Sequence, residues 1–399
     1  MRFRELTELP VQGKSVFLRL DLNVPLKDGV IQDDTRIREA LPTLKYLLEK
    51  TNKVVVASHL GRPKTAEDKQ KLSLEPIGIR LAELLGKELI FIRDYEKKPV
   101  DQMLLQLEKN QFILLENLRF YEQETKNDPG FSEVLRKGID FYVNDAFGAI
   151  HRAHASTVGL PEKMESENRA IGFLIKKELE ALDALKRRPQ APYSAVLGGA
   201  KVADKIDVLF SLAQSCNHIL IGGAMAYTFL KYKGVSVGSS ILAVDKDKSL
   251  EAFYQQAEAR RVQVHLPVDH VCAETFDEKA SPRIIEGAIP AGWMGLDIGP
   301  KTLALYRDIL KSSKTIFWNG PLGVFEWPAF SHGTIGIAKA IAESGAYSLA
   351  GGGESVSAIH MAGVDKKFSH ISTGGGASLE YLEGKVLPGL KVLSSLKSS

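Results

Sequence analysis

Short apolar runs recur along the chain, and each is followed by a polar or glycine-rich turn and then by an amphipathic stretch of helical length. The runs are 16–20, 54–57, 89–92, 112–115 and 141–143 in the first half, and 195–197, 218–221, 262–266, 296–298, 315–318, 347–350 and 368–371 in the second. Most are apolar almost throughout, as strands covered by helices on both faces must be. The pattern predicts an α/β fold with parallel β-sheets flanked by helices.

Two domains are expected, because 399 residues exceed what one hydrophobic core usually supports. An irregular stretch at 169–176 meets a highly charged helix over 176–188, which ends at Pro189. A helix this polar is typical of a bridge between lobes, although an ordinary surface helix has the same pattern. We predict two Rossmann-like lobes joined by a hinge at 169–176: an N-terminal domain over 1–170 and a C-terminal domain over 171–388. The tail, 389–399, could pack on either lobe, including back on the N-terminal domain.

Composition and charge limit the class of partner. Apolar residues make up 44% and charged residues 25%, which is a globular balance, and the net charge of +3 gives no reason to expect nucleic-acid binding. Two cysteines, Cys216 and Cys272, are too few for a disulfide framework and fit a reducing cytoplasm. The N-terminus lacks the apolar core of a signal peptide, and the longest apolar stretch, 219–230, is too short to span a bilayer. We expect a soluble cytoplasmic protein without a membrane partner.

The residues just after each predicted strand are the candidate site, because ligands of open parallel sheets bind beyond the carboxyl ends of the strands. In the first half these segments are 21–23, 58–62, 116–119 and 144–148, followed by 151–154, and Arg36 comes shortly after the first. They are rich in arginine, whose planar cationic fork matches carboxylate and phosphate oxygens. A single arginine is more often a solvated surface charge. Several at strand ends predict a compact polyanionic ligand.

The corresponding segments of the second half are rich in glycine: 198–201, 222–224, 299–300, 319–323, 351–355 and 373–376. Glycine lets the backbone approach a ligand closely, and a helix that begins just afterwards points unsatisfied N–H groups at phosphates. Tight turns also use glycine routinely, so one such segment would mean little. The whole set indicates a nucleotide-binding site formed largely by backbone.

Several familiar sites are excluded by the sequence. A Walker A loop would need glycine where Glu8 stands before Gly13-Lys14-Ser15, no GxGxxG follows a predicted strand, and no GxSxG is present. His151 and His154 could share a helical face, but no cluster nearby completes a plausible metal set. Because strands end in arginines in the first half and in glycines in the second, the sequence favours an enzyme that moves a phosphoryl group between a nucleotide and a small anion.

The segments 19–26, 58–63, 114–120, 143–148, 151–154, 198–205, 319–327 and 372–380 resemble the motifs of the phosphoglycerate kinase family, in the family's order and along essentially the whole chain. The resemblance implies a monomeric glycolytic enzyme. Its implied reaction is reversible phosphoryl transfer from 1,3-bisphosphoglycerate to MgADP, which gives 3-phosphoglycerate and MgATP.

The resemblance also implies roles for individual residues. Phosphoglycerate would be held by Asp21, Asn23, Arg36, His59, Arg62, Arg119 and Arg152, with Arg36 also reaching the transferring phosphoryl. Lys201 and Lys205 would contact the nucleotide phosphates, and Lys201 would stabilise charge during transfer. The nucleotide pocket would further include Gly199, Gly222, Gly295, Asn319, Glu326 at the ribose, Gly352, Gly353, Glu354 and Ser355. Gly374, Gly375 and Gly376 would present backbone N–H groups toward the cleft.

Two positions depart from the family pattern. The family usually carries aspartate after the three glycines, where it helps to hold nucleotide-bound Mg²⁺, and this chain has Glu354. Because Mg²⁺ tolerates poor geometry badly, the added methylene requires that the loop retreat or that a water bridge the gap. Ala224 stands where a further glycine is expected and would narrow that part of the pocket.

The implied chemistry needs no general base, because the acceptor carboxylate is already ionised at neutral pH. Positioning and charge neutralisation remain, and two ligands on different lobes can meet only if the lobes close and exclude water. Two other readings stay open. One is a different ATP-dependent enzyme acting on another carboxylate, such as an acyl-phosphate-forming ligase. The other is a binding protein that closes on an anion, which leaves Lys201 and the glycine run unexplained.

Overall fold

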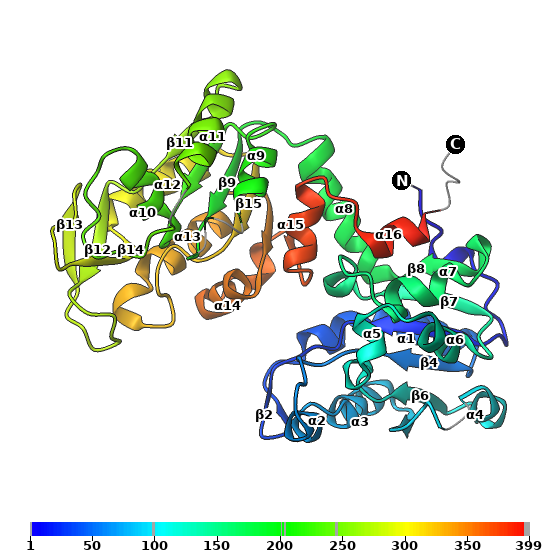
Figure 1. Ribbon diagram of the computed structural model, residues 1–399. Helices are drawn as coiled ribbons and strands as arrows, with labels where there is room; N and C mark the ends of the chain where they lie inside the picture. Colours follow the sequence, from blue (N-terminus) through cyan, green and yellow to red (C-terminus); the bar gives the residue numbers. More distant parts are fainter. Residues whose placement is uncertain (1, 98–99, 201, 203–204, 244–245, 395–399) are drawn as a thin grey trace. The chain divides into compact units, whose positions relative to one another are not determined.

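The computed structural model describes residues 2–97, 100–200, 202, 205–243 and 246–394 (Figure 1). The chain divides into two compact units: unit 1 comprises residues 1–179 and 386–399, and unit 2 comprises residues 180–385. The division falls inside the long helix α8 (Phe173–Arg187), rather than at the predicted 170/171. The residues from 386 onward belong to unit 1.

Unit 1 is built on a six-stranded parallel sheet with the order β5-β6-β4-β1-β7-β8. The strands are β1 (Val16–Leu20), β4 (Val54–Ala57), β5 (Glu88–Ile92), β6 (Gln111–Leu115), β7 (Phe141–Asp145) and β8 (Arg169–Ile171). All five strands predicted for this half are present. The prediction of an irregular stretch from 169 is wrong at its start, because residues 169–171 pair with β7. Three residues are too few to show a strand's periodicity.

Helices flank this sheet, and several of them bury apolar side chains in the core. They are α1 (Thr35–Lys50), α2 (Ala66–Lys71), α3 (Glu75–Leu85), α4 (Val100–Gln106), α5 (Glu122–Thr125), α6 (Pro129–Arg136), α7 (Leu160–Glu162) and α16 (Pro388–Leu393). In α1 the buried residues Ile37, Ala40, Leu44 and Leu47 recur at helical spacing and join the core with β1 and β4. A two-stranded hairpin, β2 (Leu26–Lys27) and β3 (Val30–Ile31), follows β1. Helix α16, red in Figure 1, packs on β8 and α7.

Unit 2 contains a second six-stranded parallel sheet, with the order β11-β10-β9-β15-β16-β17. Its strands are β9 (Tyr193–Leu197), β10 (His218–Ile221), β11 (Gln263–His265), β15 (Thr315–Asn319), β16 (Tyr347–Gly351) and β17 (His370–Ile371). Each corresponds to a predicted apolar run, so the predicted α/β class with parallel sheets is confirmed. The central strands β9 and β15 are buried at every residue.

A smaller sheet in unit 2 was not predicted. It consists of β12 (Asp269–Ala273), β13 (Arg283–Glu286) and β14 (Met294–Ile298), in the order β13-β12-β14, and every pairing is antiparallel. The apolar run 296–298 therefore lies in an antiparallel sheet and not in one of the parallel sheets. An apolar run indicates that a strand is buried but does not give the direction of its partner. The partner strands β12 and β13 begin with charged residues and give a weak strand signal.

The helices of unit 2 are α9 (Ile206–Leu212), α10 (Met225–Tyr232), α11 (Asp247–Ala259), α12 (Pro300–Ser312), α13 (His332–Glu343), α14 (Gly353–Ala362) and α15 (Gly376–Leu382). Two buried carboxylates cap the first turns of α12 and α13. Asp269 accepts hydrogen bonds from the backbone N–H groups of Lys301 (2.9 Å) and Thr302 (2.8 Å), and Asp297 accepts one from Gly333 (2.7 Å). Both caps anchor a helix to the smaller sheet.

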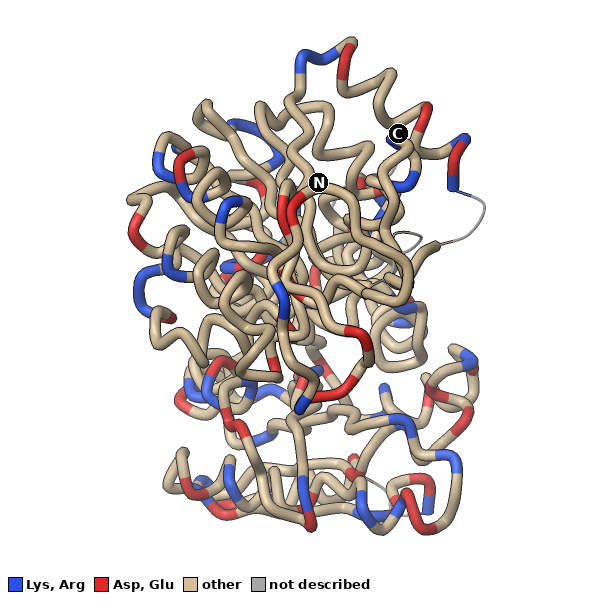
Figure 2. Tube along the Cα trace, turned by 90° about the vertical axis from the view of Figure 1, so that its left-hand side faces the viewer, with Lys and Arg blue, Asp and Glu red and all other residues tan. Residues whose placement is uncertain are grey.

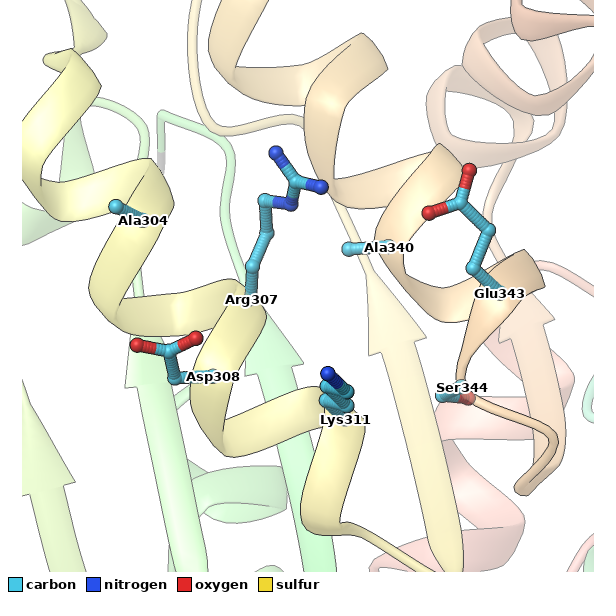
Figure 3. Close-up of a pocket in the computed structure, with 7 residues that line it drawn as sticks. All are labelled: Ala304, Arg307, Asp308, Lys311, Ala340, Glu343 and Ser344. Atoms are coloured by element: carbon cyan, nitrogen blue, oxygen red, sulfur yellow. The ribbon is translucent and has the colours of Figure 1, made fainter.

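A groove of about 390 Å³ lies between the C-terminal halves of α12 and α13 (Figure 3). It is lined by Ala304, Arg307, Asp308, Lys311, Ala340, Glu343 and Ser344. The charges around it are of both signs and exposed, and none of the predicted site residues lines it.

Charged residues of both signs are interspersed along the trace (Figure 2), as the small net charge leads one to expect. Among the described helices, none is long and apolar enough to cross a membrane.

Candidate functional site

The arginine-rich segments of unit 1 follow neighbouring strands of its sheet. Asp21 and Asn23 follow β1, His59 and Arg62 follow β4, Arg119 follows β6, Arg152 follows β7, and Arg36 lies in the first turn of α1. Since β6, β4, β1 and β7 are adjacent and parallel, their carboxyl ends form one edge of the sheet. The fold therefore brings the residues predicted for phosphoglycerate to the same edge.

Asp21 organises the centre of this edge. Its carboxylate is buried and forms an ion pair with Nη1 of Arg36. Burial alone would raise the pKa of Asp21, but the charges of Arg36 and Arg19 and a hydrogen bond from the backbone N–H of Asn23 oppose it, and the pKa lies below the usual value. The Asn23 side-chain oxygen accepts a hydrogen bond from the backbone N–H of Gly61 at 2.8 Å. These contacts fix the loops after β1 and β4 to each other and to α1.

Several cations are crowded together at this edge. Arg119 donates from Nη1 to the Gly61 carbonyl at 2.6 Å, and its pKa is lowered to about 10, first by burial and then by the charges of Arg19 and Arg152. Arg152 is half-buried and donates from Nε to His151 at 3.2 Å. Arg62 is exposed on the loop after β4. The repulsion between these like charges destabilises the empty site, and a bound anion would reduce that repulsion.

A buried network behind this edge was missed when site residues were predicted. Arg19, fully buried in β1, donates from Nε to Ser156 Oγ at 2.8 Å, from Nη1 to the Leu20 carbonyl, and from Nη2 to His59 Nδ1 at 3.2 Å. Ser156 donates from its backbone N (2.9 Å) and from Oγ (2.6 Å) to the buried carboxylate of Glu124. The one sequence signal was a charged residue inside an otherwise apolar strand.

The glycine-rich segments of unit 2 also follow adjacent strands. Gly198 and Gly199 follow β9, Gly222 follows β10, Asn319 ends β15, Gly352 to Ser355 follow β16, and Gly374 to Gly376 follow β17. The strands β10, β9, β15, β16 and β17 are consecutive neighbours, so these loops lie along one edge. Lys201 lies outside the described residues.

Three of these loops touch one another through glycine. A Cβ built on Gly198 would lie 2.0 Å from the Pro321 carbonyl oxygen, and one built on Gly223 would lie 2.6 Å from the Gly199 backbone nitrogen. The Gly199 N–H donates to the Pro321 carbonyl at 2.7 Å. Lys205 donates from Nζ to the carbonyls of Gly198 and Asn319, the latter at 3.1 Å. These glycines are therefore needed for loop packing as well as for any approach to a ligand.

Asn319 and Ser355 are buried and hold the neighbouring loops. Asn319 donates from Nδ2 to the Gly351 carbonyl at 2.7 Å, and Ser355 Oγ accepts from the Gly320 N–H at 2.6 Å. Helix α14 begins at Gly353, after Gly352 with φ of 93°. Glu354 is exposed in its first turn.

The loop after β17 leads into α15. The N–H of Gly374 donates to Ser372 Oγ at 3.1 Å, and that hydroxyl lies 2.6 Å from Ser378 Oγ. Gly375 has φ of 52°, and α15 begins at Gly376. The backbone thus turns sharply at the predicted phosphate loop.

Two other predicted nucleotide residues are not part of these glycine loops. Gly295 belongs to β14, and a Cβ there would lie 1.9 Å from Tyr227 Oη, so its backbone packs directly on that buried ring. Its N–H donates to Ser240 Oγ at 3.0 Å. Glu326 is exposed in the segment after β15.

Neither a protein-made metal cage nor a reactive thiol is found within the described parts of the chain. No group of three or more histidine, cysteine, aspartate or glutamate residues there could hold a metal ion. Both cysteines are buried and free, and burial raises the pKa of the Cys272 thiol to about 12.

Comparison with known proteins gives one consistent family. Residues 6–385 match the family model described as phosphoglycerate kinase. The chain is 50% identical over 391 residues to a phosphoglycerate kinase of Rubrobacter xylanophilus, with 98% of each chain covered. It is 50% identical over 399 residues to a chloroplastic phosphoglycerate kinase of Volvox carteri, covering 98% of this chain and 85% of that one. The solved phosphoglycerate kinase of Coxiella burnetii superposes with a TM-score of 0.86 at 37% identity, covering 98% of this chain and 99% of that one.

Proposed function

The chain belongs to the phosphoglycerate kinase family, and from that premise we propose which of its residues carry the transfer of a phosphoryl group between 1,3-bisphosphoglycerate and MgADP. The observation that carries the assignment is the division of strand ends between the units. Cations gather at adjacent strand ends in unit 1, and glycine loops gather at adjacent strand ends in unit 2. Unit 1 is therefore the phosphoglycerate-binding domain, and unit 2 the nucleotide-binding domain.

In unit 1, Arg36, Arg119 and Arg152 bind the phosphate and carboxylate oxygens of phosphoglycerate, with Arg62, His59, Asn23 and Asp21 completing the site. The support is electrostatic: the lowered pKa of Arg119 reflects burial and neighbouring cations, and a dianion would favour the charged guanidinium. Asp21 holds Arg36 in place through their ion pair. With its Nη1 held by Asp21, Arg36 also contacts the transferring phosphoryl group in this proposal.

In unit 2, the nucleotide phosphates lie against the loops after β9, β16 and β17, with Gly199, Gly352, Gly353 and Gly374 to Gly376 as backbone contacts. Lys201 stabilises the transferring charge, and Lys205 acts on the phosphates through the loops that its ammonium group joins. Gly222, Gly295, Asn319 and Ser355 shape the pocket, and Glu326 reaches the ribose. A φ of 93° at Gly352 and of 52° at Gly375 supports these roles, because such turns expose successive N–H groups.

The nucleotide would be accompanied by Mg²⁺, and Glu354 is the residue that would help to hold the ion. Its carboxylate is exposed at the start of α14. Bound Mg²⁺ neutralises phosphate charge.

The reaction itself requires no proton transfer. The acceptor carboxylate of 3-phosphoglycerate is ionised at neutral pH, and ADP is a ready nucleophile in the other direction. The residues of the chain position both ligands and neutralise charge, with Arg36 and Lys201 on the phosphoryl group. Because the two ligands bind to separate units, we infer that hinge closure brings them together and excludes water that would hydrolyse the acyl phosphate.

The setting of the enzyme is also a proposal. We infer a monomer that works in cytoplasmic glycolysis and binds neither nucleic acid nor membrane. Sedimentation equilibrium at micromolar concentration should give the mass of one chain, 43.8 kDa. A stable dimer would contradict the monomer.

The site assignment is tested by titrating 3-phosphoglycerate and MgADP separately into three proteins: the unmodified chain, Arg36→Ala and the matched control Arg38→Ala. Arg38 lies on the same helix, is 56% exposed and pairs with Asp34 instead of Asp21. Arg36→Ala should weaken 3-phosphoglycerate binding at least tenfold and leave MgADP binding unchanged, and Arg38→Ala should change neither. Equal effects of the two substitutions would refute the assignment of Arg36.

A further inference from the structure

The contact between Arg19 and His59 determines which ring nitrogen of His59 carries the proton. Nη2 of Arg19 lies 3.2 Å from Nδ1 of His59, and both residues are buried. A guanidinium has N–H groups only and cannot accept a hydrogen bond or lose its proton in a protein. The nitrogen it faces must therefore be the acceptor, which means that Nδ1 of His59 carries no proton.

Arg19 cannot turn away to release this constraint. Its Nε donates to Ser156 Oγ at 2.8 Å, and its Nη1 donates to the Leu20 carbonyl. Ser156 is in turn held by two hydrogen bonds to the buried carboxylate of Glu124, at 2.9 and 2.6 Å. Three nitrogens of the Arg19 guanidinium thus make hydrogen bonds. Of these three bonds, the one to His59 involves an ionisable side chain of the predicted ligand site.

The charges around His59 work in the same direction. Burial, together with Arg19, Arg119 and Arg36, lowers the pKa of His59 well below its usual value, and only the carboxylate of Asp21 opposes them. An imidazole without a proton on Nδ1 and without a positive charge has its single proton on Nε2.

We propose that Arg19 is a positioning residue that locks His59 as the neutral Nε2–H tautomer, so that His59 meets the phosphoglycerate oxygens as an uncharged hydrogen-bond donor. The proposal rests on the assignment of His59 to the phosphoglycerate site. It separates two kinds of contact in that site: the arginines supply charge, and His59 supplies a directed N–H that does not change between pH 6 and 8. Phosphoglycerate binding should then gain nothing from protonation of this histidine.

The direct test is NMR of the full-length protein with ¹⁵N-labelled histidine, with the His59 signals assigned by their loss in a His59→Gln sample. We expect an unprotonated Nδ1 and a protonated Nε2 that do not titrate between pH 6 and 8. A proton on Nδ1, a mixture of tautomers or a titration near pH 6.5 would overturn the proposal. None of these outcomes depends on activity, so the proposed reaction could survive the loss of this inference.

Substitutions of His59 test which nitrogen binds. Glutamine places its amide near the position of Nε2, and asparagine places it near the position of Nδ1. His59→Gln should therefore bind 3-phosphoglycerate at least tenfold more tightly than His59→Asn, with equal binding of MgADP by both. The reverse order would contradict an Nε2–H donor.

Arg19→Gln tests this role of Arg19, because the glutamine side chain ends two bonds short of the Nη2 position and so removes the N–H group that faces Nδ1 of His59. The expected result is that His59 shows both tautomers by NMR and that KM for 3-phosphoglycerate rises about tenfold, a change of about 1.4 kcal/mol, with kcat little changed. Arg93→Gln is the control: Arg93 is 67% exposed in the same unit and pairs with Glu75. A single Nε2–H tautomer in folded Arg19→Gln would show that Arg19 does not determine the tautomer of His59. If Arg19→Gln does not fold, the spectrum of the unmodified protein still decides between the tautomers.

Discussion

Gly223→Ala tests whether the loops of unit 2 require glycine for close packing. Gly223 has φ of 64°, in the left-handed region, and an alanine Cβ there would lie 2.6 Å from the Gly199 nitrogen and 2.7 Å from the Pro321 carbonyl oxygen. Both neighbours are backbone atoms, so they cannot move aside as the end of a side chain can. The substitution should force apart the loops after β9, β10 and β15.

The magnitude has two parts. A left-handed conformation costs a residue other than glycine about 1–2 kcal/mol, and overpacking at a site with rigid neighbours costs about 1–3 kcal/mol. The predicted loss of unfolding free energy is the sum, about 2–5 kcal/mol. Gly287→Ala separates the parts, because Gly287 has nearly the same φ, 66°, but no atom within 4 Å of the added Cβ. It should lose only the first part.

The assay is equilibrium unfolding in urea followed by tryptophan fluorescence. All three tryptophans, Trp293, Trp318 and Trp327, belong to unit 2, so the signal reports on the unit that carries both substitutions. MgADP affinity is measured beside it, and we expect it to fall in Gly223→Ala and not in Gly287→Ala. If the two variants lose the same free energy and bind MgADP equally well, the reasoning from close backbone approach is wrong.

Three further predictions concern unit 2. Lys205→Met removes the ammonium group that joins the Gly198 and Asn319 carbonyls. It should lower the free energy of unfolding in urea by about 1.5–3 kcal/mol and weaken MgADP binding. If neither quantity changes, Lys205 does not join these two loops. Burial raises the pKa of Asp297 from 3.8 to about 8. Between these two pH values its carboxyl group is therefore protonated in the folded state and ionised in the unfolded state. Its contribution to stability should therefore fall as pH rises from about 4 to about 8, and Asp297→Asn should flatten that part of the pH profile of unfolding, whereas an unaltered profile would count against the raised pKa. Glu354→Asp should keep or improve the Mg²⁺ dependence of turnover, and a large loss would show that the loop is built around the longer side chain.

Most of the parallel core could be predicted because strands buried on both faces are nearly continuous apolar runs in the sequence. The runs 16–20, 54–57 and 218–221 have the same bounds as β1, β4 and β10. The antiparallel sheet could not be predicted in the same way. Strand β12 begins with Asp269 and His270, which give no apolar signal. In the structure the Asp269 carboxylate caps α12, and the His270 ring lies beside Tyr227.

The candidate site was predictable where function depends on residue type and was missed where it depends on distant contacts. Arginines and glycines at strand ends can be counted along the chain. The network of Glu124, Ser156 and Arg19 joins residues 32 and 137 positions apart, and no local pattern reveals such a pairing. The same holds for Lys205, whose contact with the Asn319 carbonyl spans 114 positions.

The measurement that tests the central claim most directly is a forward assay in which the chain receives MgADP and 1,3-bisphosphoglycerate and ATP formation is followed. Acetyl phosphate is offered in parallel as a simple acyl phosphate, and Arg36→Ala and Lys201→Ala accompany the unmodified chain. We predict rapid ATP formation from 1,3-bisphosphoglycerate, little from acetyl phosphate, and a large fall in kcat in both variants without a matching loss of stability. Equal use of both acyl phosphates, or no ATP from 1,3-bisphosphoglycerate, would contradict the account.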